Sequence, residues 1–208
     1  MDPKSLLRTL NLANQLTFLR LVAIPFLIIF VLEGRFGVAL ALFLGAAVTD
    51  LLDGLTARLF GQGTRLGAYL DPAADKLMLT ATFVLLTDFP SMFQKIEMAA
   101  RIPLWLTILT ISRDVFIVCV ALLLYLSLGQ TRFAPSLLGK LTTVSESVTV
   151  GLFLLANAVG RHFALLDVAV WCTLGLTLFS GFHYLGRTIG MLRAGAGETS
   201  GGTDEKSA

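Results

Sequence analysis

Six long apolar runs occupy most of this 208-residue sequence, and they limit the folds open to it more than any other feature. Each run is close to the roughly 20 residues that a helix needs to cross a bilayer. Mean hydropathy is +0.80 and 55% of the residues are apolar, both far above the values for a soluble domain. Since a backbone in lipid must satisfy its own hydrogen bonds, the runs favour helices. The sequence therefore predicts an all-α polytopic membrane protein with six transmembrane helices.

The expected spans are set by the ends of these runs. They cover residues 14–32, 36–58, 67–87, 102–128, 136–159 and 163–185. Ahead of them, residues 1–13 place Lys4 and Arg8 among leucines, which predicts a short amphipathic helix on the membrane surface. Residues 14–190 form one membrane domain. The last segment, 191–208, is rich in Gly, Ser, Thr and charge, and we expect it to be disordered.

Basic residues are distributed unequally between the two sides of the predicted spans. If both termini lie inside, the cytoplasmic segments contain Lys4, Arg8, Arg20, Arg58, Arg65, Arg132, Lys140, Arg187, Arg193 and Lys206, and the opposite side holds Arg35, Lys95, Arg101 and Arg161. Cytoplasmic segments carry an excess of Lys and Arg, so this bias predicts cytoplasmic termini, with the cell inner membrane as the expected location. Net charge is only +2 and no basic, aromatic-interleaved patch occurs, so we expect no nucleic-acid partner.

Four aspartates, Asp50, Asp53, Asp71 and Asp75, interrupt the second and third runs. Their spacings of three and four residues place each pair on one face of a helix. Glycines between residues 61 and 67 indicate a short turn between the two helices. If those helices pack antiparallel, the pairs face each other and four negative charges converge beside lipid. Such a cluster needs cations to neutralise it, and carboxylate oxygens favour hard divalent ions.

The residues around the aspartates point to phosphate chemistry. Two divalent ions roughly 4 Å apart form a clamp for a diphosphate. Gly54 lets a ligand approach its helix closely, and Arg58 offers a guanidinium fork for phosphate oxygens. A carboxylate at the edge of the metal site can take a proton from an attacking hydroxyl. Together these features predict phosphoryl transfer from a diphosphate donor to an alcohol at the membrane surface.

Two other interpretations of the acidic cluster have to be weighed. The aspartates could simply form ion pairs with Arg58, Arg65 and Lys76, as they would in a soluble protein. Alternatively, a transporter or channel could use intramembrane carboxylates to carry cations. Such proteins more often place their acids near the bilayer midplane on interrupted helices and contain internal repeats. Here the acids lie at one membrane face beside glycines and an arginine, which suits a nucleotide diphosphate better.

From Asp50 to Asp75 the sequence reads Asp-x2-Asp-Gly-x2-Ala-Arg-x8-Gly-x3-Asp-x3-Asp. This pattern is complete and resembles the signature of the CDP-alcohol phosphotransferase family. Eight fixed positions at fixed spacings inside an apolar chain make a specific match. The likeness covers about residues 11–190. It includes the stretches 14–20, 111–114 and 138–140, with Ala13 in place of a proline common in the family.

The resemblance implies six transmembrane helices around a polar cavity open to the cytoplasm, usually in a homodimer surrounded by membrane lipid. It implies that Asp50, Asp53, Asp71 and Asp75 bind two Mg2+ or Mn2+ ions, and that Asp75 is also the general base. The implied donor is CDP-diacylglycerol, with its lipid tails in a groove that faces the bilayer. The residues implied to bind its cytidine diphosphate moiety are Asn14, Thr17, Gly54, Arg58, Thr64 and Gly67.

A second group of basic residues lies outside the donor motif. Arg113 and Asp114 could simply neutralise each other within the helix bundle. We expect instead that Arg113 faces the cavity, because adjacent helix residues project about 100° apart and Asp114 cannot easily share its direction. Lys140 and Arg187 are expected to join Arg113 in binding an acceptor phosphate. Glu146, which lies between two serines, is expected to form interhelical hydrogen bonds and to have no catalytic role.

The resemblance leaves the acceptor open between two glycerol-based compounds. The stretches 111–114 and 180–184 are similar to family members that form cardiolipin from phosphatidylglycerol. The N-terminal half is equally similar to members that form phosphatidylglycerophosphate from glycerol 3-phosphate. We therefore expect a CDP-diacylglycerol-dependent phosphatidyltransferase of phospholipid biosynthesis that uses one of these acceptors and releases cytidine monophosphate (CMP).

Overall fold

The structure is a computed structural model, and it describes residues 12–60, 67–88, 96–128 and 137–200. Within these ranges, the side chains of residues 12–17, 50–60, 67–73 and 190–200, and of several others, lie outside the description. The helices of the described part are α2 (Leu12–Leu32), α3 (Phe36–Phe60), α4 (Gly67–Leu85), α5 (Leu104–Leu128), α6 (Leu137–Val159) and α7 (Ala164–Ser200). The described chain is therefore all-helical with six helices, as the sequence predicts.

Each helix begins and ends close to the limits predicted from the apolar runs, except at the end of α7. Two ends are set by glycines with positive φ, Gly34 at 72° and Gly160 at 70°. After α2 the amide of Arg35 donates to the carbonyl of Phe30 at 2.8 Å, and an equivalent bond follows α6. This capping pattern needs a left-handed residue just after the helix, and a residue without Cβ adopts it most readily.

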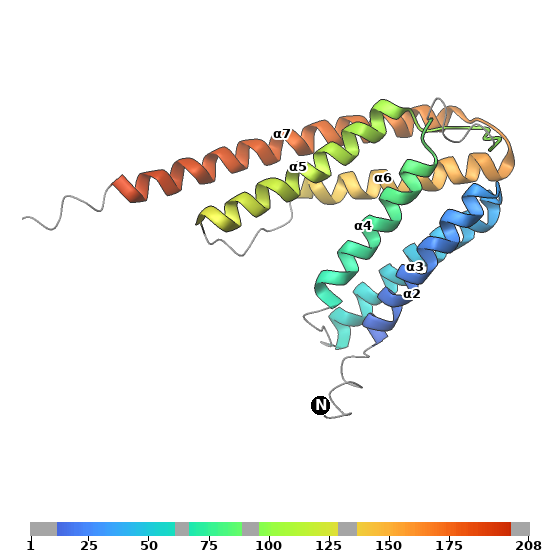
Figure 1. Cartoon of the computed structure of the whole chain (residues 1–208), viewed down its shortest axis with the longest axis horizontal. Helices are drawn as coiled ribbons and strands as arrows, with labels where there is room; N and C mark the ends of the chain where they lie inside the picture. The colour runs from blue at the N-terminus through green and yellow to red at the C-terminus, as the bar shows by residue number, and fades with distance from the viewer. Residues whose placement is uncertain (1–11, 61–66, 89–95, 129–136, 201–208) are drawn as a thin grey trace, which may run out of the picture.

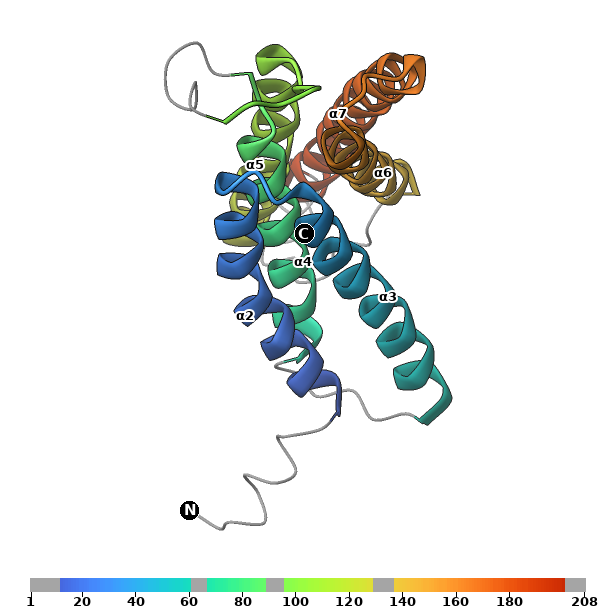
Figure 2. The ribbon, with the colours of Figure 1, turned by 90° about the vertical axis from the view of Figure 1, so that its right-hand side faces the viewer.

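The six helices form two groups of three, α2 with α3 and α4, and α5 with α6 and α7 (Figure 1). In the first group α2 packs against both α3 and α4, and in the second α7 packs against both α5 and α6. The groups are joined by the contact of α3 with α6 and by smaller contacts of α4 with α5 and α6. From this junction the two groups diverge, as the second view also shows (Figure 2).

Buried apolar side chains gather where the two groups meet. They include Leu27 and Val31 of α2, Phe43 of α3, and Val150 and Leu154 of α6. In lipid such a core is stabilised by close van der Waals packing, since lipid tails are as apolar as the side chains themselves. The core lies toward the end of α2 and the beginning of α3. The aspartate motif lies away from this core, at the end of α3 and the beginning of α4.

Hydroxyl groups line the contact between α6 and α7. Thr173 Oγ1 of α7 lies 2.7 Å from Ser145 Oγ and 2.8 Å from Thr149 Oγ1, both of α6. Further along, the Thr142 hydroxyl donates to the carbonyl of Leu176 at 3.2 Å. Small hydroxyl side chains let helices approach closely and bond across the contact. α6 and α7, joined by a short turn, therefore form a hairpin held by both packing and polar bonds.

Large apolar side chains cover much of the outer surface. Phe179 and Phe182 on α7 are 70% and 71% exposed, and Leu126 on α5 is 71% exposed. Apolar surface of this extent marks a site of interaction with a membrane or another protein. Among the described residues, the helices long and apolar enough to cross a bilayer by length and composition are Leu137–Val159 and Ala164–Gly186, with shorter apolar helices at Phe18–Leu32 and Phe36–Thr49.

The structure bears differently on the predictions for the two termini. α7 continues to Ser200, beyond the end of the last predicted span, whereas the sequence predicts disorder from residue 191 onward. The disordered tail stays a prediction. Residues 201–208 lie outside the described residues, as does the amphipathic helix expected at 1–13 except for its last two positions.

Candidate active site

The four motif aspartates fall on two helices at one end of the molecule. Positions 50 and 53 lie in the C-terminal part of α3, and positions 71 and 75 lie in the first turns of α4. Both views place these helix ends at the same end of the molecule as the beginning of α2 (Figures 1 and 2). Because α3 and α4 are continuous through these positions, the members of each pair share one face of their helix.

α3 and α4 run in opposite directions, and each packs extensively against α2, while α3 also packs against α6 (Figure 1). Figure 2 shows α3 leaning away from α4 toward the motif end. How the two pairs of acids face each other lies outside the described side chains, so the convergence of the four carboxylates stays a prediction. α2 also places Arg20, only 2% exposed, inside this group of helices.

Most predicted site residues at this end lie beyond what the structure describes. The side chain of Asp75 is described and is half-buried. Side chains outside the described residues are those of Asn14, Thr17, Asp50, Asp53, Gly54, Arg58, Gly67 and Asp71, and Thr64 lies in the connection 61–66, which is wholly outside them. The described side chains contain no group of three or more His, Cys, Asp or Glu that could hold a metal. Three of the four motif aspartates have side chains outside the described residues, so this result does not test the motif. The metal and donor assignments stay predictions.

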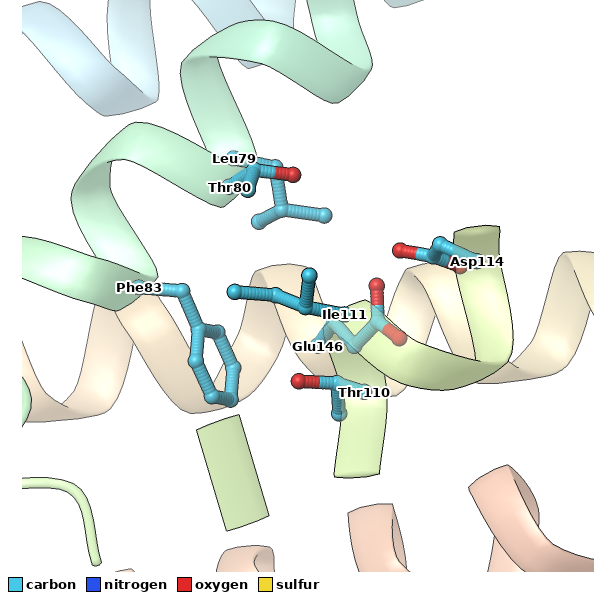
Figure 3. A pocket seen from close by; sticks show the side chains of 7 residues that line it. All are labelled: Leu79, Thr80, Phe83, Thr110, Ile111, Asp114 and Glu146. Atoms are coloured by element: carbon cyan, nitrogen blue, oxygen red, sulfur yellow. The ribbon is translucent and has the colours of Figure 1, made fainter. Parts of the chain in front are cut away.

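Directly after Asp75, Lys76 links three helices. Its Nζ lies 2.7 Å from Asp114 Oδ2 on α5 and 2.9 Å from Glu146 Oε2 on α6. The Glu146 side chain is only 3% exposed, so its charge depends on a counter-ion within the protein. Figure 3 shows both carboxylates beside the space between α4, α5 and α6. The interhelical role predicted for Glu146 is confirmed, with Lys76 as its partner.

Arg113 pairs with its neighbour in the chain. Its Nη1 lies 2.8 Å from Asp114 Oδ1, and its Nη2 donates to Ser180 Oγ on α7. The expectation that Arg113 and Asp114 cannot share a direction is wrong, because the long arginine side chain reaches the carboxylate although the two Cβ atoms diverge. At 9% exposure the guanidinium also needs a counter-ion. Lys76, Arg113, Asp114 and Glu146 thus form a cluster of two cations and two anions, called here the charge network.

The basic residues predicted to bind the acceptor are not brought together in the described part of the chain. Arg113 belongs to the charge network and also borders an apolar cavity of about 390 Å³ between α5 and α7. Lys140 is exposed near the beginning of α6, and no described contact joins it to Arg113. The side chain of Arg187, on α7, lies outside the described residues. Their acceptor role stays a prediction.

The charge network is the feature that sequence reasoning missed. In the sequence Lys76 enters only as one possible ion-pair partner of the motif aspartates, whereas the structure pairs it with Asp114 and Glu146. The available signal is the presence of ionisable residues inside three separate apolar runs, since charged residues within a membrane almost always pair with one another. Which of them pair depends on how the helices pack, and a single sequence does not specify this.

The chain is helical and largely apolar, and it carries the complete acidic motif on α3 and α4 with the charge network directly after Asp75. These features are typical of a membrane-associated transferase. Comparison with known proteins identifies the family. The family model for CDP-alcohol phosphatidyltransferases matches residues 10–179, so this chain belongs to that family. It is therefore an enzyme, and the transporter or channel interpretation is not supported.

Family members of two kinds resemble the chain along most of its length. A probable phosphatidylglycerophosphate synthase of Mycobacterium tuberculosis is 32% identical over 191 residues, covering 88% of this chain and 83% of that protein. The CDP-diacylglycerol–glycerol-3-phosphate 3-phosphatidyltransferase of Bacillus subtilis is 31% identical over 194 residues, covering 85% of this chain and 94% of that protein. The CMP-forming cardiolipin synthase of Homo sapiens is 28% identical over 203 residues, covering 88% of this chain and 64% of that protein. The family resemblance predicted from the motif is confirmed.

Replacing Lys76 is expected to destabilise the protein, because Lys76→Met leaves Glu146 buried without its counter-ion. Breaking a buried pair from one side lowers the free energy of unfolding by about 3–5 kcal/mol. The double variant Lys76→Met/Glu146→Gln removes both charges and keeps the Arg113–Asp114 pair, so we expect it to recover most of that loss. Denaturant unfolding in detergent, followed by circular dichroism, measures both variants.

The control for this comparison is Glu33→Gln. It removes an exposed pair in which Glu33 Oε2 lies 3.8 Å from Arg35 Nη1. Exposed ion pairs contribute about 0–1 kcal/mol, so this variant is expected to unfold nearly as the wild type does. A double variant as unstable as Lys76→Met would contradict the counter-ion argument.

Proposed function

We propose that this enzyme transfers the phosphatidyl group of CDP-diacylglycerol to glycerol 3-phosphate and releases CMP. The observation that carries the proposal is the complete motif from Asp50 to Asp75, on α3 and α4, inside a family match over residues 10–179. Glycerol 3-phosphate is favoured by the two bacterial relatives, of which the match covers 83% and 94%. Their names specify this acceptor or the product it gives.

Phosphatidylglycerol, which would give cardiolipin, is a second acceptor favoured by one observation. Human cardiolipin synthase is 28% identical over 203 residues, and the match covers 88% of this chain. Both acceptors present a glycerol hydroxyl to the same donor, so one active site suits either. Which acceptor reacts depends on the binding site next to that hydroxyl. A site for a small phosphate group would favour glycerol 3-phosphate, and a site for a second lipid would favour phosphatidylglycerol.

In the proposed reaction the acceptor hydroxyl oxygen attacks the β-phosphorus of the donor. The bond from that phosphorus to the oxygen bridging to the α-phosphorus breaks, and CMP leaves with the electron pair. Asp75 is proposed to accept the hydroxyl proton, because its half-buried carboxylate lies in the first turns of α4 close in sequence to Asp71. A positioned general base contributes about 10²–10⁴-fold to a rate.

We propose that Asp50, Asp53, Asp71 and Asp75 hold two Mg2+ or Mn2+ ions. The residues fit such ions, because all donors are carboxylates and each pair occupies one face of a continuous helix. When bound, the ions would neutralise the diphosphate and make its phosphorus a better electrophile. The proposed donor-binding residues, which flank these acids in the sequence, are Asn14, Thr17, Gly54, Arg58, Thr64 and Gly67.

We also propose that all six helices cross the cell inner membrane, with both termini and the active site on the cytoplasmic side. The unequal distribution of Lys and Arg supports this orientation. Trp105 and Trp171, with ring centroids 6.2 Å apart in the N-terminal parts of α5 and α7, suit an aromatic belt at a membrane interface, which occurs on either side of a bilayer. Membrane lipid, and a second copy in a homodimer, would cover the exposed apolar surface.

The product tests the proposed reaction. Purified enzyme in mixed micelles is supplied with CDP-diacylglycerol and either glycerol 3-phosphate or phosphatidylglycerol, and the lipids are separated by thin-layer chromatography. We expect phosphatidylglycerophosphate, with one CMP released per product, from the first mixture. Cardiolipin from the second mixture alone would change the acceptor, and no CMP release from either would overturn the proposed function.

Removing divalent metal is expected to abolish turnover. The proposed donor set contains carboxylate oxygens without thiol or imidazole, so it favours hard ions such as Mg2+ and Mn2+. Activity assayed in excess chelator should fall to background and return when either ion is added beyond the chelator. Full turnover in excess chelator would exclude the two-metal proposal.

Asp75→Asn and Asp53→Asn are expected to fail in different ways. Asp75→Asn keeps one ligating oxygen but removes the basic group, so donor binding should partly survive while the rate falls by at least about 10²-fold. Asp53→Asn should lose metal and donor binding together. CDP-diacylglycerol binding with metal present and single-turnover CMP release distinguish the two. Near-normal turnover by Asp75→Asn would mean that another group is the base.

Lys140→Ala is expected to raise the KM for glycerol 3-phosphate about tenfold, the effect of losing one charge-assisted hydrogen bond. The KM for CDP-diacylglycerol should change little, and Lys140→Arg, which keeps the charge, should stay close to wild type. Arg113→Ala should act in the same direction, but it also removes the partner of Asp114 and is the less specific test. A rise confined to the donor KM would place Lys140 in the donor site.

A further inference from the structure

We propose that Lys76 is a positioning residue for the last motif carboxylate, Asp75, because its two ion pairs fix the rotation of α4 about its own axis. The inference rests on the proposed function, which gives Asp75 its roles as general base and metal ligand. Three observations support it: Lys76 directly follows Asp75 in α4, its ammonium group forms ion pairs with residues of α5 and α6, and a small cavity lies beside these contacts.

Asp75 and Lys76 are consecutive residues of α4, which is continuous from Gly67 to Leu85. Consecutive side chains project about 100° apart around a helix axis. Lys76 can therefore contact α5 and α6 while Asp75 keeps a different direction. Since a short helix turns as a rigid unit, a rotation that took Lys76 away from its partners would move Asp75 through the same angle.

Two different helices hold Lys76. Asp114 Oδ2 of α5 lies 2.7 Å from its Nζ, and Glu146 Oε2 of α6 lies 2.9 Å from it. With a single ion pair α4 could still rotate about that contact. Partners on two different helices restrict the direction in which Lys76 can project from α4, and so restrict the rotation of α4 about its axis. Asp114 is fixed in turn by Arg113, whose guanidinium also bonds Ser180 of α7. The restraint on α4 is thus anchored in three other helices.

Apolar packing holds α4 firmly on the side of α2, where Met78 and Leu79 are buried in the core, and supplies less restraint on the side of α5 and α6. The extensive contacts of α4 are with α2, and its contacts with α5 and α6 are small. A cavity of about 10 Å³ separates Leu79, Thr80 and Phe83 of α4 from Asp114 and Glu146 (Figure 3). A void forfeits the van der Waals contacts that would resist movement. The second oxygen of Glu146, Oε1, is buried with no hydrogen-bond partner among the described residues, so the bond from Lys76 orients this carboxylate.

A positioning role and a purely structural role make different predictions for the charge-balanced variant Lys76→Met/Glu146→Gln. This variant lacks the ion pair but leaves no buried charge unpaired, so we expect it to fold stably. If Lys76 only stabilised the fold, activity would return together with stability. If Lys76 positions Asp75, the stable variant stays impaired, and the defect lies in kcat and in metal affinity more than in the KM for CDP-diacylglycerol.

The experiment compares the wild type, Lys76→Met/Glu146→Gln, Lys76→Arg and the control Glu33→Gln as purified full-length proteins in detergent. Steady-state kinetics with CDP-diacylglycerol and glycerol 3-phosphate give kcat and KM, and electron paramagnetic resonance of free Mn2+ gives metal affinity without turnover. Groups that orient a metal ligand typically contribute 10–100-fold to affinity or activity, so the double variant should lose about 10–100-fold in kcat and about tenfold in Mn2+ affinity. Lys76→Arg keeps the cation and should retain most of both.

A stably folded double variant with wild-type kcat and wild-type Mn2+ affinity would overturn the positioning role. An equal loss in Lys76→Arg and in the double variant, with Glu33→Gln unaffected, would contradict the proposal that the cation and its two ion pairs position Asp75. If the wild type binds Mn2+ but releases no CMP with either acceptor, the proposed reaction fails. The Mn2+ comparison would then still decide whether Lys76 orients Asp75.

Discussion

The packing of α4 to α7 depends on one requirement, that charges placed among apolar helices be neutralised inside the protein. Lys76 lies between Asp114 and Glu146, and Arg113 approaches Asp114 from the other direction. A buried charge without a partner costs several kcal/mol, so helices that carry these residues are stable only where the partners meet. Apolar faces alone would tolerate several rotations, and the pairing favours one of them. The same four residues thereby connect the helix that carries Asp75, which belongs to the first group, to the helices of the second group.

The apolar core and the proposed active site lie at different ends of the first group of helices. Apolar residues such as Leu27, Phe43 and Leu154 close the end where the two groups of helices meet. The motif positions occupy the far ends of α3 and α4, where the two helices diverge and α2 contacts both. A tightly packed motif end would leave no room for a diphosphate and its ions. The charge network lies between these regions and restrains α4 where apolar contact is sparse.

The outline of the fold could be predicted because it follows from local properties of the sequence. Apolar runs define the helices, and Gly34 and Gly160 end two of them through backbone geometry that does not depend on distant residues. The family could be recognised for the same reason, since the spacing of the aspartates is a local property and the family model matches residues 10–179, while the metal and base roles of the aspartates stay predictions. The partners of Lys76 could not, because Asp114 and Glu146 reach it only after three helices have packed. The pairing of Arg113 with Asp114 was mispredicted because Cβ directions say little about the reach of a long side chain.

The hydroxyl contacts between α6 and α7 bear on how the chain assembles in a bilayer. Thr173 bonds Ser145 and Thr149 across a hairpin whose helices are adjacent in sequence, so these contacts close only a short loop. Contacts of low sequence separation form early, and α6 and α7 are long and apolar enough to insert as a pair. Glu146 lies on this hairpin and Lys76 lies on α4, so their ion pair joins the two groups and can form only when the groups meet. A contact within one hairpin thus carries the acid, and a contact between distant parts of the chain neutralises it.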